Sequence, residues 1–180
     1  MLFRSNSPRE YSADRVSGRT LVISTTNGTA ALHACRAARE ILVGAIVNRA
    51  AVAAAIRLLA ATDERVHLVC AGTDGEPSAE DVLAAGAILD AAAADGPADV
   101  LDAAAAAARG MFRDLVAGQQ GHVPGALGRA FAQSPGGANL IALGMSDDLA
   151  TCAQIDTLEI VPRLDRECGC LRQEIGRAHV

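Results

Sequence analysis

The sequence predicts an α/β fold, a three-layer α/β/α sandwich around a largely parallel or mixed sheet. Apolar runs rich in β-branched residues alternate with alanine-rich segments, and this alternation is typical of strands connected by covering helices. The apolar runs are continuous, as in strands that are buried on both faces. With 180 residues, 51% of them hydrophobic, the chain is long enough for one well-packed domain. We expect that domain over residues 6–174.

Four apolar runs are the expected strands. TLVIS, EILVGAIV and RVHLVC occupy residues 20–24, 40–47 and 65–70. TLEIV at residues 157–161 is the last, and it ends at Pro162 because proline cannot donate a hydrogen bond within a central strand.

The expected helices follow these strands and fill the middle of the chain. Asn48 is placed to cap one helix, and Ser78 with an acid three residues later has the spacing of a capping box. Alanine runs favour helix because alanine has the highest helix propensity. The expected ranges are 29–38, 48–61, 78–94, 98–117, 124–133, 135–143 and 146–154.

Composition and charge exclude several classes of protein. The net charge is −5 and the arginines are scattered, so we expect no nucleic-acid partner. No apolar run approaches the roughly 20 residues of a membrane helix, so we expect no membrane association. The five cysteines have irregular spacing, which favours a reduced, cytoplasmic protein. The sequence is compatible with a homo-oligomer.

The two ends of the chain have unusual sequences. Residues 175–180 (IGRAHV) match the translation of a common sequencing adapter, and residues 2–5 fit the opposite adapter. We therefore expect residues 1–5 and 175–180 to be non-native, to pack against nothing, and the natural gene to begin upstream.

Polar residues gather where three predicted strands end. In parallel sheets these ends share one edge, and ligands bind there. Main-chain N–H groups, hydroxyls and a glycine suit a phosphate, although Thr and Asn also cap helices. Acids in a first helical turn either stabilise the helix dipole or hold a hard cation such as Mg²⁺. The candidates are Thr25, Thr26, Asn27, Gly28, Thr29, Asn48, Glu80 and Asp81.

Other reactive side chains have weaker patterns. His122 lies in a loop between glycines, from which it could reach a site. Cys70 ends a predicted strand, where it is either a nucleophile or a small apolar filler. Arg49 could contact a substrate anion or lie in solvent. Cys168 and Cys170 supply too few ligands for structural zinc.

The order of several short motifs resembles the 2-phosphosulfolactate phosphatase (ComB-like) family. The matching stretches are Asn6 to Tyr11, residues 25–29, Val47-Asn48, Cys70-Ala71-Gly72, Ala79-Glu80-Asp81, Ala85-Gly86-Ala87, Ser134, Asn139-Leu140 and Asp148 to Cys152. Members of this family carry a further strand–loop–helix section with an Asp-x-x-Arg-Ala-type motif, which this chain does not contain. The resemblance therefore implies a partial domain, whose sheet should show an unpaired apolar edge or an uncovered face.

The resemblance also implies an activity. It is the Mg²⁺-dependent hydrolysis of a small anionic phosphomonoester, 2-phospho-3-sulfolactate, to 3-sulfolactate and phosphate in coenzyme M biosynthesis. Residues 25–29 and Asn48 would bind the phosphate, and Glu80 and Asp81 would be the catalytic and metal-binding residues. One alternative is a non-catalytic homologue that binds an anion or phosphate. Another is a Rossmann-type nucleotide-binding domain, but no Gly-x-Gly-x-x-Gly follows the first predicted strand.

Overall fold

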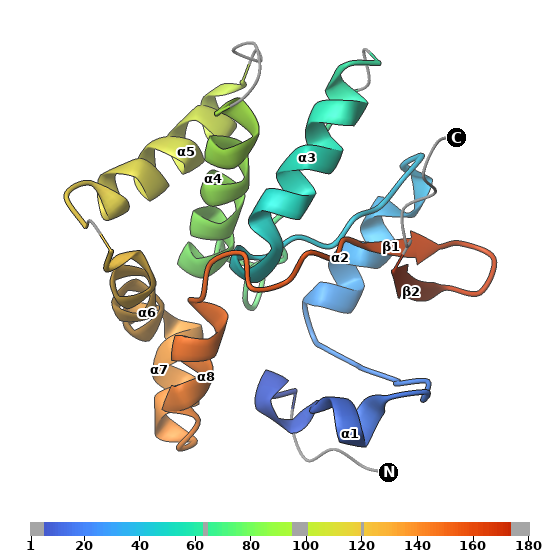
Figure 1. Cartoon of the computed structure of the whole chain (residues 1–180), viewed down its shortest axis with the longest axis horizontal. Coiled ribbons are helices and arrows are strands. Elements are labelled where there is room, and N and C mark those ends of the chain that lie inside the picture. Colours follow the sequence, from blue (N-terminus) through green and yellow to red (C-terminus); the bar gives the residue numbers. More distant parts are fainter. Residues whose placement is uncertain (1–5, 63–64, 95–100, 120, 174–180) are drawn as a thin grey trace.

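The computed structural model describes residues 6–62, 65–94, 101–119 and 121–173. The expectations for the two ends, residues 1–5 and 175–180, lie outside these ranges. The described part is a mixed α/β structure in which helices predominate (Figure 1). Helices α3, α4 and α5 lie side by side, and α6, α7 and α8 gather at the lower end of α4 and α5. In this part of the chain no helix is long and apolar enough to cross a bilayer.

Within the described residues all seven predicted helices are confirmed, with their boundaries moved by a few residues, and residues 98–100 of the helix predicted over 98–117 lie outside the described ranges. The short additional turns are η1 (Pro8–Glu10), α1 (Ala13–Val16), η2 (Cys35–Ala37) and η3 (Ile46–Asn48). The predicted helices are α2 (Gly28–Ala34), α3 (Arg49–Ala60), α4 (Ala79–Ala93), α5 (Ala103–Val116), α6 (Val123–Gln133), α7 (Pro135–Ala142) and α8 (Ser146–Cys152).

The predicted strands at residues 20–24, 40–47, 65–70 and 157–161 are not confirmed. Among the described residues, the named strands are β1 (Pro162–Asp165) and β2 (Cys170–Gln173), which form an antiparallel hairpin. Pro162 begins a strand instead of ending one, a position that proline tolerates. The predicted three-layer sandwich with a parallel sheet is not confirmed.

Apart from Ile46 and Val47, which belong to η3, the predicted strand segments are nevertheless non-helical. Residues 40–47 and 157–161 run together, joined by hydrogen bonds such as Leu158 N–H to the Val47 carbonyl at 2.8 Å. One isolated antiparallel bridge links Leu42 to Arg163 of the hairpin. Residues 20–24 and 65–70 have no strand partner within the described residues, so they form no ladder. A strand needs hydrogen bonds from a neighbouring chain segment, which apolar sequence alone does not provide.

The core consists of two clusters around α4. We call the first the central cluster. It joins η3, α4, α5, α6 and α8, and Leu127 at its centre is fully buried. The second cluster packs α3 against the opposite part of α4. Because α4 contributes to both, its first turn is held at a fixed position.

Candidate functional site

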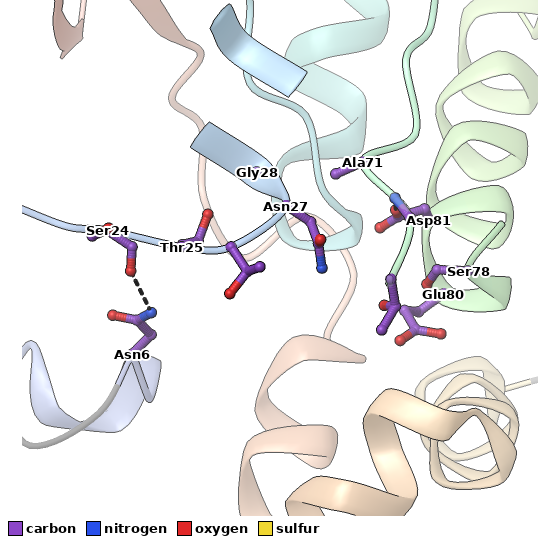
Figure 2. Close-up of a pocket in the computed structure, with 12 residues that line it drawn as sticks. Asn6, Ser24, Thr25, Asn27, Gly28, Ala71, Ser78, Glu80 and Asp81 are labelled. Carbon is purple, nitrogen blue, oxygen red and sulfur yellow. Dashed lines mark hydrogen bonds between the residues drawn. The ribbon is translucent and has the colours of Figure 1, made fainter. Parts of the chain in front are cut away.

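A pocket of about 410 Å³ lies between the segment that enters α2 and the segment that enters α4. In Figure 2 the side chains of Thr25 and Asn27 lie on one side, and those of Glu80 and Asp81 lie on the other. The lining residues are Asn6, Ser24, Thr25, Thr26, Asn27, Gly28, Ala71, Gly72, Thr73, Ser78, Glu80 and Asp81. The structure thus brings together most of the predicted site.

The loop at residues 25–29 is closed by its own threonines. The N–H of Thr29 donates to Thr25 Oγ1 at 3.0 Å, and the Thr29 hydroxyl donates to the Thr25 carbonyl. Gly28 allows this closure, since a Cβ there would lie 2.9 Å from Thr25 Oγ1. Asn27 is at the N-cap position of α2, but its side chain makes no capping hydrogen bond. Its amide is therefore available to the pocket, whereas Thr29 supports the loop and does not line the pocket.

The second wall is shaped by Asp81. Its Oδ2 accepts a hydrogen bond from the Gly72 N–H at 2.8 Å. Gly72 has a φ of +70°, a conformation that favours glycine, and paired main-chain hydrogen bonds join Thr73 and Glu76 beyond it. The predicted capping box is wrong, because Ser78 is the N-cap residue without a side-chain capping bond. Asp81 holds the preceding loop instead of the start of its own helix.

Glu80 has a different environment from its neighbour. Its Oε2 atom is buried and has no hydrogen-bond partner among the described residues. A buried carboxylate oxygen is stable only with a donor or a cation beside it. In the described part of the chain, no group of three or more His, Cys, Asp or Glu side chains could hold a metal. Mg²⁺, however, commonly uses one or two carboxylates together with waters and substrate phosphate, so the unpaired oxygen of Glu80 fits such an ion.

Asn48 lies elsewhere and is not part of the pocket lining. It is 5% exposed. Its Oδ1 accepts from the Ala45 N–H at 2.8 Å, and its Nδ2 donates to the carbonyls of Val43 and Ile160 at 3.2 and 2.9 Å. These bonds join the segment that precedes α3 to the segment at residues 157–161. The side chain predicted to bind phosphate therefore has its hydrogen-bonding groups directed to the main chain.

The sequence interpretation missed Asn6 and Ser24 as site residues. Asn6 Nδ2 donates to the Ser24 carbonyl at 3.1 Å, as the dashed line in Figure 2 shows. The next residue, Ser7, donates to buried Asp148 on α8 at 2.8 Å, and Arg9 pairs with Asp147 at 2.7 Å. The signal was present in the matched stretch from Asn6 to Tyr11, but its contact with Ser24, which immediately precedes residues 25–29 (the TTNGT segment), depends on the fold.

The other reactive candidates are outside the pocket lining. Cys70 is exposed, and desolvation together with the Asp81 carboxylate raises the pKa of its thiol. A raised pKa lowers the thiolate fraction and so disfavours a nucleophilic role. Arg49 pairs with Asp156 at 2.9 Å and lies over the Phe112 ring, so it packs at the edge of the central cluster. His122 is the residue before α6.

Comparison with known proteins identifies the relatives of this chain. A family model described as 2-phosphosulpholactate phosphatase matches residues 3–167. A "Probable 2-phosphosulfolactate phosphatase" of Deinococcus radiodurans is 40% identical over 172 residues, which cover 93% of this chain and 67% of that protein. Proteins of the same name from Symbiobacterium thermophilum and Synechococcus sp. RCC307 are 39% and 41% identical. They are matched over 87% and 93% of this chain and over 63% and 66% of their own lengths. The chain thus spans about two thirds of the length of these relatives.

Proposed function

The chain belongs to the 2-phosphosulfolactate phosphatase family, and from this premise we propose that it hydrolyses a small anionic phosphomonoester with Mg²⁺. By resemblance, the substrate is 2-phospho-3-sulfolactate and the products are 3-sulfolactate and phosphate. One observation carries the proposal. Hydroxyl and amide donors of the TTNGT segment face the Glu80 carboxylate across a single pocket.

The residues on the loop side suit the phosphoryl group. Thr25, Thr26 and Asn27 offer hydroxyl, amide and main-chain donors, and Gly28 leaves room for the Thr25 side chain to close the loop. Donors that are fixed before substrate arrives stabilise developing charge without reorganising. The internal closure of this loop by Thr25 and Thr29 provides that rigidity.

The residues on the opposite wall of the pocket, Glu80 and Asp81, suit a hard cation. Bound Mg²⁺ would neutralise phosphoryl charge and lower the pKa of a water molecule. Glu80 would hold it through the oxygen that has no partner among the described residues, and Asp81 is the second predicted carboxylate of the same wall. Neither assignment depends on Asn48, whose predicted contact with phosphate would require it to exchange its main-chain partners.

The proposal extends to the fold. Ser24, at the end of segment 20–24, and Ala71, directly after segment 65–70, both line the pocket, the arrangement expected of strands in a parallel sheet. We propose that these segments are strands of the three-layer sandwich in the complete family fold. Their exposed apolar side chains, including Val22 and Val69, support this part of the proposal.

The test is release of inorganic phosphate by the purified chain from 2-phospho-3-sulfolactate and a panel of other phosphomonoesters, with and without Mg²⁺. We expect release that requires Mg²⁺ and that falls about 100-fold in Asn27→Ala, the range seen when one transition-state donor is removed. Gln173→Ala, which removes an exposed amide on β2, is the matched control. Phosphate binding without turnover would identify the alternative, a non-catalytic anion-binding homologue.

A further inference from the structure

The two adjacent acids at the start of α4 have unequal surroundings. Asp81 is already engaged by the Gly72 N–H at 2.8 Å. Glu80 has a buried oxygen with no partner among the described residues. Of the two acids, Glu80 is therefore the one whose buried oxygen needs a partner that a cation could supply, and Asp81 acts by fixing the loop beside it.

The start of α7 lies against the Glu80 carboxylate. A Cβ added at Gly136 would be 2.6 Å from Glu80 Oε1 and 3.8 Å from its carboxyl carbon. The φ of Gly136 is outside the left-handed region, so its backbone does not require glycine. Alanine would also be the better helix former there. The carboxylate of Glu80 is thus the group that would have to move if a side chain were placed at this position.

Gly136 is itself held firmly. Ser134, which is 4% exposed, donates to the Phe131 carbonyl at 2.9 Å and accepts from the Gly137 N–H at 3.0 Å. Gly137 packs so closely that a Cβ would lie 1.9 Å from the Phe131 carbonyl oxygen. The turn from α6 into α7 is consequently a rigid support, and it fixes the surface on which the Glu80 carboxylate rests.

We propose that Gly136 is a positioning residue that sets the direction of the Glu80 carboxylate, and that Glu80 is the direct ligand of the cation while Asp81 is a second positioning residue. This inference rests on the cation site of the proposed function. It adds a part of the chain, the first turn of α7, that lies about fifty residues away in sequence and outside the pocket lining.

The experiment is a titration of the chain with Mn²⁺ as the probe, without substrate, followed by the electron paramagnetic resonance signal of free Mn²⁺. We expect Glu80→Gln to abolish binding and Gly136→Ala to weaken it by about 10-fold or more, as for residues that orient a ligand. Asp81→Asn should weaken it less than Gly136→Ala does. Gly128→Ala on α6 is the matched control, because its Cβ would meet only the Ala153 Cβ at 3.9 Å.

A double-mutant cycle separates positioning from a general effect on folding. Asp is one methylene shorter than Glu, so the side chain of Glu80→Asp withdraws from the space that the Gly136→Ala methyl would occupy. We expect Gly136→Ala to change Mn²⁺ affinity by less than about twofold in the Glu80→Asp background, because the two positions are coupled. The thermal unfolding midpoint of Gly136→Ala should equal or exceed that of the wild type.

The outcomes distinguish this inference from the proposed function. If wild type binds Mn²⁺ and releases phosphate but Gly136→Ala binds normally, the role of Gly136 is overturned and the proposed function stands. A loss of affinity that is equal in both backgrounds, or that accompanies a lower unfolding midpoint, also overturns it. Retention of Mn²⁺ by Glu80→Gln overturns the ligand assignment. If the wild type neither binds Mn²⁺ nor releases phosphate, the proposed function itself fails.

Discussion

The helical body and the two extended segments that enter the pocket contrast sharply in burial. Leu127 on α6 is fully buried, and Phe112 on α5 is 2% exposed. In the segment at residues 20–24, Val22 is 95% exposed and Ile23 is 51% exposed, and Val69 in the segment at residues 65–70 is 57% exposed. The two regions are similarly apolar in sequence, so hydrophobicity alone does not decide which of them is buried.

The difference follows from where main-chain hydrogen bonds are made. A helix satisfies its N–H and C=O groups within itself and then needs only a packing face. Residues 20–23 and 66–71 make no main-chain hydrogen bond to other described residues. Such groups require a partner strand or water. The extended segments position the site through their ends, while the helical body supplies the stability.

The largest expected effect is in the helical body. Leu127→Ala should lower the free energy of unfolding by about 3 kcal/mol, because it leaves a cavity in the central cluster. Val22→Ala in the exposed segment should change it by less than about 0.5 kcal/mol. Urea unfolding followed by circular dichroism measures both. Similar losses in the two variants would show that the segment at residues 20–24 is buried in solution and would remove the contrast.

A smaller effect is expected where α4 crosses α5. A Cβ at Gly86 would lie 2.1 Å from the Ala108 carbonyl oxygen, so Gly86→Ala must push the helices apart and should cost about 1–3 kcal/mol. Gly110→Ala on α5 is the matched control, since nothing lies within 4 Å of its Cβ position. That control should be stabilised by about 0.4–1 kcal/mol. Thermal unfolding of the two variants would contradict close packing of α4 on α5 if both were stabilised.

The smallest effect is expected at the boundary between the two regions, where residues 65–70 meet α4. Desolvation and the Asp81 carboxylate raise the pKa of the Cys70 thiol. Removing that charge in Asp81→Asn should lower the pKa, while the larger cause, desolvation, still holds it above its ordinary value. At a fixed pH below the pKa, Cys70 alkylation should then be faster.

The measurement is the rate of iodoacetamide labelling as a function of pH, with each cysteine followed by mass spectrometry. The midpoint of the profile reports the pKa, and the plateau reports access to the thiol. Cys152 is the internal control, because desolvation and Asp148 raise its pKa and Asp81 is not among the causes. An unchanged midpoint for Cys70 would show that the extended segment does not hold its thiol near α4.

Sequence alone determined the helices and which polar residues would gather at one pocket. Helix depends on local periodicity, alanine content and end signals such as Pro135, and these are readable within a few residues. The convergence of the TTNGT loop with Glu80 and Asp81 followed from the order of apolar runs and polar ends, and the structure places these residues around one pocket.

Tertiary structure alone decided the partners of the extended segments and the roles of individual polar side chains. Strand pairing depends on which distant segments meet, so residues 20–24 and 65–70 could not be assigned from their own composition. For the same reason the sequence could not predict the contacts of three side chains. Asp81 accepts a hydrogen bond from Gly72, Asn48 bonds to the main chain, and the Glu80 carboxylate lies against Gly136. Hydrogen bonds and close contacts between residues far apart in sequence are set by the three-dimensional arrangement, because no local pattern records which neighbour will be within reach.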